Sequence, residues 1–368
     1  MKISIITFHD TFNFGATLQC AALCKYLASQ GHEITVLNYM PKYIRNKKSS
    51  LKEFYNIGLR HGISSKFKAI LKGLFYILYF RNVQKRDKAY SNFIKGNINI
   101  SKQIFNYEEL KSLPNSDFFI CGSDQIWNPN LTGGRFDKAF FLDFIKKDKI
   151  AYGVSTGEID LNKYKPELLD LTKDFVRISV RESSTAKTLG SILNREINVV
   201  LDCTLLLDDN DYVKMEVDID NTEPYLLFYN VSSEPIANVT ARIISQKLGL
   251  QIIDVSPSPF IRIPGAKKIA DIGPGEFLGY VRKAKFIVTN SFHGTVFSII
   301  YKKDFYSIPH KTRAGRVVDL LDSLELSDRL IRNVEDIKFD SIDYKRSYAC
   351  LYKARLSSFE FLNSINCK

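Results

Sequence analysis

The six cysteines of this 368-residue chain form no CxxC pair and follow no regular spacing. Structural zinc sites and disulfide frameworks need such patterns, so the sequence predicts neither of them. Four of the cysteines lie in apolar or helical patterns, where a free cysteine packs as a small hydrophobe. No pair of carboxylates and no His/Cys cluster indicates a metal site. We therefore expect no metal and no cofactor.

Targeting segments, membrane-spanning segments and repeats are also missing from the sequence. Met1 leads directly into the apolar residues 2–8, which leaves no room for a signal peptide. No apolar run is long enough to span a bilayer. There is no repeat at the periods of solenoids and no low-complexity tract. We expect a cytoplasmic protein with reduced thiols.

Positive charge is concentrated in one segment, residues 42–95. This segment holds fourteen Lys and Arg residues against Glu53 and Asp87, so it accounts for the whole net charge of +12. It reads as helices and interleaves the charges with aromatic residues, at Phe54, Tyr55, Phe67, Phe75, Tyr76, Tyr79 and Phe80. One interpretation is a peripheral contact with anionic lipid at the inner face of the cell membrane. In the other, the aromatic residues pack on the first domain and the lysines face water. No nucleic-acid motif accompanies the charge, so we expect no nucleic-acid partner.

The length and the apolar content of 45% predict two packed domains of α/β class. Buried-strand patterns alternate with helices in the first half, at residues 3–8, 34–39, 117–121, 150–154, 175–180 and 199–202. Residues 208–224 are acidic and rich in turn residues, as in a connection between domains. A second α/β set starts at residue 225, with strands at 285–289 and 305–308 and helices at 316–324 and 343–363. We expect two Rossmann-like domains, at 1–208 and 222–342, followed by a helix at 343–368.

His293 occupies a position typical of a ligand site. It follows the buried strand at 285–289, and Asn290 and Ser291 before it are good helix N-cap residues. The carboxyl ends of strands line the ligand cleft of open α/β sheets, and a helix N-terminus favours an anion. A histidine there can exchange a proton near neutral pH. The alternative is a histidine that only caps the helix or packs.

Six motifs in order along residues 13–309 carry a resemblance: NFGATLQCAAL, FFICGSDQIWNP, KIAYGVSTG, ISVRESSTAKTLG, VVLDCTLLL and FIVTNSFHGTVFSIIYKKDF. In these motifs the chain resembles the polysaccharide pyruvyl transferase family. The resemblance implies two Rossmann-like domains facing a central cleft, as in GT-B glycosyltransferases, with the last helix crossing back to the first domain. It also implies phosphoenolpyruvate as the donor substrate and a pyruvate ketal on two hydroxyls of a cell-surface polysaccharide precursor, whose acceptor glycan could still be linked to lipid.

The resemblance assigns catalytic roles to His293 and Arg181, the latter in a motif similar to the family's Arg-Glu-x-x-Ser. A salt bridge of Arg181 with Glu182 or another partner is the alternative. Many family members carry Arg two residues before the histidine, where this chain has Ser291. We expect the donor side of the cleft to hold Asn290, Ser291, Gly294, Lys311, Arg313 and Arg316. The basic residues among them could replace the missing charge, or could form a solvated loop.

The acceptor side is predicted in the first domain, where polar residues follow the first and third strands of the sequence. The predicted acceptor residues are Asn13, Gly15, Gln19, Ser123, Asp124, Gln125 and Trp127. A tryptophan beside Asp and Gln offers a sugar an apolar face and directional polar groups. Alternatively, Trp127 is a core residue and Asp124 an N-cap. His9 and Asp10 are weaker candidates.

Two other functions fit the same pattern. A GT-B glycosyltransferase would share the fold and bind the diphosphate of a nucleotide sugar at the His293 helix. A non-catalytic glycan-binding member of the family, suggested by Ser291, would bind sugar without releasing phosphate from phosphoenolpyruvate.

Overall fold

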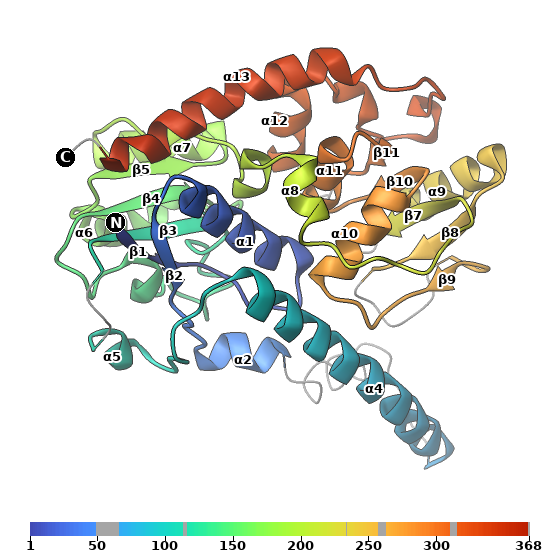
Figure 1. Cartoon of the computed structure of the whole chain (residues 1–368), viewed down its shortest axis with the longest axis horizontal. Helices are drawn as coiled ribbons and strands as arrows, with labels where there is room; N and C mark the ends of the chain where they lie inside the picture. Colours follow the sequence, from blue (N-terminus) through green and yellow to red (C-terminus); the bar gives the residue numbers. More distant parts are fainter. Residues whose placement is uncertain (49–65, 113–115, 233, 257–262, 310–314, 367–368) are drawn as a thin grey trace.

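The computed structural model describes residues 1–48, 66–112, 116–232, 234–256, 263–309 and 315–366 (Figure 1). Within these ranges the side chains at 47, 48, 66–79 and 366 are not described. The described chain forms two parallel sheets, one of six strands and one of five, and helices pack around both.

The first sheet has the strand order β2-β1-β3-β4-β5-β6, and every pairing in it is parallel. Its strands are β1 (Lys2–Ile6), β2 (Glu33–Val36), β3 (Phe118–Asp124), β4 (Lys149–Val154), β5 (Arg177–Val180) and β6 (Asn198–Val199). The helices in this part of the chain are α1 (Phe14–Ser29), α2 (Lys42–Lys48), α4 (Lys66–Asn97), α5 (Tyr107–Leu110), α6 (Lys165–Thr172) and α7 (Ser183–Leu193). Strands β1, β3 and β4 are buried along almost their whole length, as expected for a parallel sheet covered on both faces.

The second sheet has the order β11-β10-β7-β8-β9 and is also parallel throughout. Its strands are β7 (Tyr225–Tyr229), β8 (Gln251–Asp254), β9 (Lys267–Lys268), β10 (Phe286–Thr289) and β11 (Asp304–Ser307). The later helices are α8 (Asp209–Val213), α9 (Pro235–Leu248), α10 (Pro274–Lys283), α11 (Phe292–Ile300), α12 (Gly315–Ser323) and α13 (Tyr344–Asn363). The predicted fold class, two Rossmann-like α/β units of GT-B type, is confirmed.

Several strands end earlier than the sequence predicts, and the early end of β6 bears on the site. The pattern at 199–202 predicts a strand, but β6 stops at Val199. Asp202 instead caps a short 3-10 turn at Cys203–Leu206, because its Oδ1 accepts a hydrogen bond from Thr204 N at 2.9 Å. The turn places the Asp202 carboxylate at the carboxyl end of the sheet.

Helix α1 lies between the two sheets. Thirteen of its sixteen residues are buried, which is the pattern of a helix covered on all sides. Phe14 in its first turn stacks on Phe277 of α10, with ring centroids 4.6 Å apart, and also meets Tyr229 at the end of β7. The N-terminal end of α1 is therefore packed against the second half of the molecule.

Helix α13 joins the two halves along the top of the view in Figure 1. At its start, the hydroxyls of Tyr344 and Tyr348 donate to backbone carbonyls of the second half, at Lys303 and Ile300. Further along, Arg355 donates from Nε to the Leu205 carbonyl at 2.6 Å, and Phe359 stacks on Tyr26 of α1. The C-terminal end of α13 thus lies against the first half.

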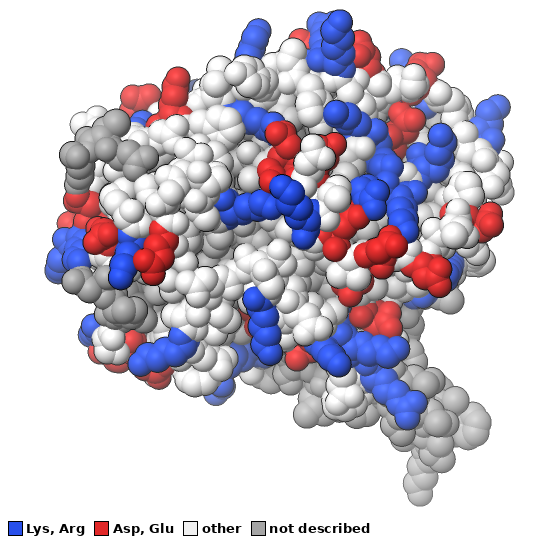
Figure 2. Space-filling view, viewed as in Figure 1, with Lys and Arg blue, Asp and Glu red and all other residues white. Residues whose placement is uncertain are grey.

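Helix α4 covers much of the basic segment 42–95, and its N-terminal part extends away from the rest of the molecule (Figure 1). Tyr90, Phe93 and Ile94 near its other end are buried in the main core. Of the seven aromatic residues named for a membrane contact, only the Phe80 side chain is described, and it is 36% exposed. On the face in Figure 2, Lys and Arg are intermixed with Asp and Glu. Among the described residues, no helix combines the length and the apolarity needed to cross a membrane. The contact with anionic lipid stays a prediction.

The connection between the sheets packs tightly on α10, and two glycines allow this. A Cβ atom at Gly279 would lie 2.5 Å from the Val217 carbonyl oxygen, which is backbone and cannot rotate away. Gly275 has a similar contact, 2.9 Å from Val217 Cγ2. The predicted connection at 208–224 is therefore a packed segment in the structure.

We expect Gly279→Ala to destabilise the protein by about 1–3 kcal/mol, because the new methyl group overpacks this contact. The midpoint of urea unfolding measures the effect. The matched control is Gly96→Ala in α4, where an added Cβ meets no described heavy atom within 4 Å and no loss is expected. Equal midpoints for Gly279→Ala and wild type would contradict the close approach.

Candidate functional site

A cavity of about 430 Å³ lies between the two halves, at the carboxyl ends of their strands. This is the expected place for a ligand in open α/β sheets. The structure gathers seven of the predicted site residues in its lining: Asn13, Asp124, Gln125, Asn290, Ser291, His293 and Arg316. The first turns of α1 and α11 both line it, so the positive ends of two helix dipoles are close to its interior.

His293 lies in the first turn of α11, and Ser291 caps this helix by accepting from Gly294 N at 3.3 Å. The imidazole is buried, and the N-terminal end of α1 lies directly against it. A Cβ atom at Gly15 would be only 1.9 Å from His293 Nδ1. The position opposite the ring can therefore hold no residue larger than glycine.

Asp202 is the carboxylate of the first half that lies beside His293. Its side chain is fully buried, and its Oδ2 lies 3.7 Å from His293 Nε2. This distance suits an ion pair and exceeds that of a hydrogen bond. Burial alone would favour the neutral acid, but Arg181 and then His293 hold the pKa of Asp202 well below its usual range. Asp202 is therefore a fixed negative charge beside the histidine.

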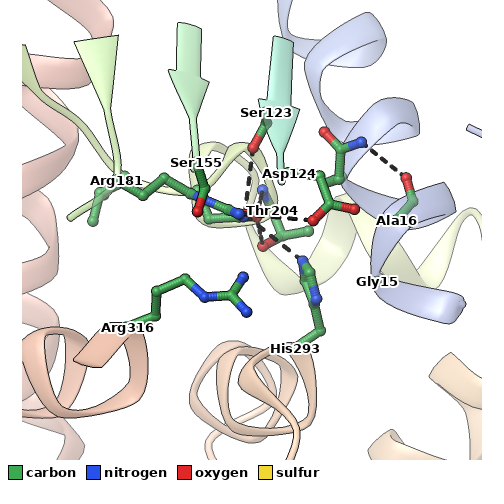
Figure 3. A network of polar contacts seen from close by, with 12 residues as sticks. Gly15, Ala16, Ser123, Asp124, Ser155, Arg181, Thr204, His293 and Arg316 are labelled. Carbon is green, nitrogen blue, oxygen red and sulfur yellow. Dashed lines mark hydrogen bonds and ion pairs between the residues drawn. The ribbon is translucent and has the colours of Figure 1, made fainter. Parts of the chain in front are cut away.

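Arg181 follows β5, and its side chain points toward Thr204 (Figure 3). Its Nη1 forms an ion pair with Asp202 Oδ2, and its Nη2 lies 3.8 Å from Asp124 Oδ1. Burial disfavours the charge, but Asp202, Glu182 and Asp124 together raise the pKa of Arg181. The structure thus places the Arg181 guanidinium in ion pairs with Asp202 and Asp124, which are partners other than Glu182 and belong to the same half as Arg181.

Arg316 in α12 is a cation with less compensation. Its side chain is 17% exposed, and its Nε lies 3.9 Å from Glu182 Oε1. Its guanidinium also lies 5.3 Å from the centre of the Phe292 ring. Burial, and then the positive charge of Arg181, lower the pKa of Arg316. A guanidinium at a cavity wall that has only this one long ion pair is suited to binding an anionic ligand.

The other predicted donor-side residues hold the backbone around His293. The Asn290 side chain accepts from Val231 N and donates to Ser232 Oγ, at 2.8 and 2.7 Å. Gly294 allows the close approach of Thr289, whose Oγ1 would lie 2.3 Å from an added Cβ. Lys311 and Arg313 fall outside the described residues.

On the acceptor side, the structure separates the predicted residues into two groups. Asn13 caps α1, accepting from Gly15 N at 3.0 Å, and it lines the cavity with Asp124 and Gln125. Ser123 is buried behind Asp124, and the two residues have φ angles of 25° and 71°. Positive φ at two successive non-glycine residues is strained backbone, of the kind that often occurs at functional sites.

Trp127 and Gln19 belong to the second group, and the structure does not support a sugar contact for either. Trp127 is fully buried: its Nε1 donates to the Phe140 carbonyl at 3.0 Å, and its ring stacks on Phe141. It is a core residue, the alternative that the sequence left open. Gln19 is equally buried and donates to carbonyls within its own helix and loop, at Ala16 and Phe8.

The two weaker candidates lie at the end of β1. His9 is buried, and its Nε2 is 3.0 Å from Asn38 Oδ1, which gives this histidine a structural partner away from His293. Asp10 is half-buried. Neither side chain lines the cavity.

Asp202 and Glu182 are the site residues that the sequence analysis missed as functional groups. Glu182 follows β5 together with Arg181, Asp202 comes shortly after β6, and Asp124 is the last residue of β3. The signal that could have found them is this shared position, because the carboxyl ends of parallel strands meet at one edge of the sheet.

The charge arrangement at Asp202 predicts a pH-dependent contribution to stability. Asp202→Asn removes the main partner of a buried arginine, and we expect a loss of about 3 kcal/mol at pH 7. The pKa of Asp202 is lower in the folded state, so its contribution is present above the unfolded-state pKa of about 3.9 and is lost as the pH falls. The two proteins should therefore differ in urea unfolding at pH 7, and the difference should begin to shrink only below about pH 4, as the pH falls toward the lowered folded-state pKa. Asp170→Asn, at an exposed ion pair with Lys173, is the control and should unfold like wild type.

Comparisons with known proteins now give this site a context. A protein assigned as a UDP-N-acetylglucosamine 2-epimerase from Listeria monocytogenes has a similar structure, with a TM-score of 0.50, 11% identity and coverage of 97% of this chain and 89% of that chain. The UDP-GlcNAc 2-epimerase from Methanocaldococcus jannaschii, in complex with UDP-GlcNAc and UDP, gives a TM-score of 0.49, 13% identity and full coverage of both chains.

At 11% identity, the similarity to the Listeria protein shows only that the two proteins share a fold. No curated protein sequence matches the chain significantly. The sequence profile of the family described as polysaccharide pyruvyl transferase matches residues 13–312, which include six of the seven predicted site residues that line the cavity, all but Arg316. The chain belongs to the polysaccharide pyruvyl transferase family.

Proposed function

We propose that this protein transfers pyruvate from phosphoenolpyruvate to two hydroxyl groups of a sugar in a cell-surface polysaccharide precursor, and that the product is a pyruvate ketal. The family supports a transferase that acts on polysaccharide. The observation that carries the finer proposal is the placement of His293 beside Asp202, in a cavity that Arg316 and two helix N-termini line.

The reaction has a clear proton balance. Two new C–O bonds form at C2 of phosphoenolpyruvate, and the bond between C2 and the phosphate oxygen breaks. One hydroxyl proton ends on C3, which becomes a methyl group, and the other leaves with inorganic phosphate. A group that both accepts and donates a proton near neutral pH suits this chemistry. We assign that role to His293.

Asp202 and Arg181 support the histidine in this assignment. The Asp202 carboxylate stabilises the imidazolium that forms when His293 takes a proton from the acceptor. Arg181 holds Asp202 in place, and its Nε and Nη2 form no hydrogen bond with the described residues. Both nitrogen atoms are buried and Arg181 does not line the His293 cavity, so we assign Arg181 a role that acts through Asp202.

Phosphoenolpyruvate carries a carboxylate and a phosphate, and the donor site must compensate both charges. Ser291 occupies the position where many family members have arginine. The Ser291 hydroxyl caps α11 and cannot supply charge. Arg316 reaches the cavity from α12, one strand and one loop later in the chain, and we assign it the compensating charge. The side that holds Asn290, Ser291 and Arg316 is then the donor side.

A glycosyltransferase that uses a nucleotide sugar is the second candidate, because the similar structures include an epimerase complex with UDP-GlcNAc and UDP. Incubation of the pure protein with labelled phosphoenolpyruvate, and separately with a panel of nucleotide sugars, distinguishes the two. Lipid-linked glycans extracted from the native host serve as acceptors in both arms. Phosphate release that depends on glycan supports pyruvyl transfer, and glycan-dependent release of nucleotide supports the alternative. A glycan-binding protein without catalysis would release neither.

We expect His293→Gln to lower the rate of phosphate release by ~100- to 10,000-fold while the protein stays folded, because general acid–base catalysis is lost. The initial rate at saturating phosphoenolpyruvate measures this effect, and circular dichroism verifies folding. His32→Gln, the same substitution at the start of β2 and outside the cavity, should keep the wild-type rate. A folded His293→Gln protein with a near-normal rate would remove His293 from catalysis.

For Arg316→Gln we expect a KM for phosphoenolpyruvate that is roughly ten- to a hundredfold higher, since a charged hydrogen-bonding partner typically contributes about 1.5–3 kcal/mol. Steady-state kinetics with varied phosphoenolpyruvate give the value. Arg332→Gln at an exposed position provides the control. If only the dependence on the acceptor changes, Arg316 belongs to the acceptor side and another cation compensates the donor.

A further inference from the structure

A second cavity adjoins the cavity at His293. It has a volume of about 310 Å³ and lies between the segment that follows β4, the first turns of α7 and the start of α12. We call it the α7 cavity. Gln125 and Arg316 line both cavities, so the two spaces meet at these side chains. The volume is at the lower end of the ~300–1,000 Å³ found for ligand pockets.

The lining of the α7 cavity is polar and negatively charged. Its charged residues are four carboxylates and one guanidinium: Glu158, Asp160, Glu182, Asp319 and Arg316. Such a field repels phosphates and nucleotides, but it accepts a neutral or cationic ligand. Hydroxyl and amide groups complete the lining, among them those of Thr156, Asn162, Ser184 and Thr188. Side chains of this kind hydrogen-bond to the hydroxyl groups of a saccharide.

Glu182 gives an independent indication of a ligand. Only 8% of this residue is exposed, and its Oε1 accepts from Ser155 Oγ at 2.6 Å. Its Oε2 is buried, and no described residue donates a hydrogen bond to it. A buried carboxylate oxygen without a donor costs free energy, so such atoms usually find a partner. A hydroxyl group of a ligand in the cavity would supply this donor.

We propose that the α7 cavity binds one saccharide unit of the acceptor, neutral or carrying a free amino group, and that Glu182 accepts a hydrogen bond from one of its hydroxyls. To call this saccharide the acceptor rests on the proposed function. Its binding in the cavity does not require phosphoenolpyruvate. With the donor beside His293, the two substrates meet at Gln125 and Arg316. This assignment moves the acceptor away from Asn13, Gly15 and Trp127 and keeps Gln125.

The test measures saccharide binding without phosphoenolpyruvate, by saturation-transfer NMR. The probes are the methyl pyranosides of galactose, glucose and mannose and their 2-amino and 2-acetamido analogues. We expect at least one probe to bind wild-type protein, and Asp319→Ala and Thr188→Val to weaken that binding roughly tenfold. The matched control is Asp322→Ala, an exposed acid on the same helix that does not line the cavity, and it should bind like wild type.

Three results would overturn the assignment. They are no binding of any probe to wild-type protein up to its solubility, unchanged binding by Asp319→Ala and Thr188→Val, or displacement of the saccharide by inorganic phosphate. The phosphate-release assay keeps this test separate from that of the proposed function. If a saccharide binds, the two variants weaken that binding and phosphoenolpyruvate is not turned over, only the proposed pyruvyl transfer is rejected. If the two variants turn over phosphoenolpyruvate normally and keep the wild-type saccharide affinity and KM for the acceptor, only the assignment of the acceptor to the α7 cavity is rejected.

Discussion

The site depends on the contact between the N-terminal ends of α1 and α11. Gly15 of the first half lies against the His293 ring of the second half, at a distance that leaves no room for a Cβ atom. The stacking of Phe14 on Phe277 of α10 holds α1 against the second half at this point. A small relative movement of the halves would open or close the space beside His293, because the ring is enclosed by residues from both. The geometry of the site is therefore a property of how the halves dock, and neither half contains it alone.

The same docking explains the charge pattern. Three carboxylates, at Asp124, Glu182 and Asp202, come from the first half, and Arg181 from that half offsets them in part. The second half adds His293 and Arg316. Opposite charges on the two halves favour the docked arrangement of the halves. Because these groups are little exposed, salt screens their interactions only weakly. In this arrangement the histidine has a fixed negative charge on one side and a weakly compensated arginine nearby.

Much of this could be predicted from the sequence, since it follows from local patterns. Buried apolar runs that end in polar residues gave the strands, and the N-cap residues before His293 gave the helix start. The rest depends on contacts between distant segments. Nothing in the local pattern of GSDQIWNP separates a tryptophan that faces a ligand from one that stacks on Phe141, and the burial of Gln19 is equally a matter of tertiary packing. Asp202 was hidden because a strand pattern was continued through it, whereas β6 ends at Val199 and the Asp202 side chain caps the next turn.

Arg316 lines both cavities, and this shared wall has a thermodynamic consequence. Its guanidinium is part of the wall of each cavity, so any position that a ligand in one cavity favours for it changes the charge that the other cavity presents. A ligand that favours one position alters the affinity for a ligand in the other cavity. Linkage requires the reverse effect to be equal in size. One side chain can in this way make the two binding equilibria interdependent, so that the order in which ligands arrive affects the occupancy of each cavity without any larger rearrangement of the fold.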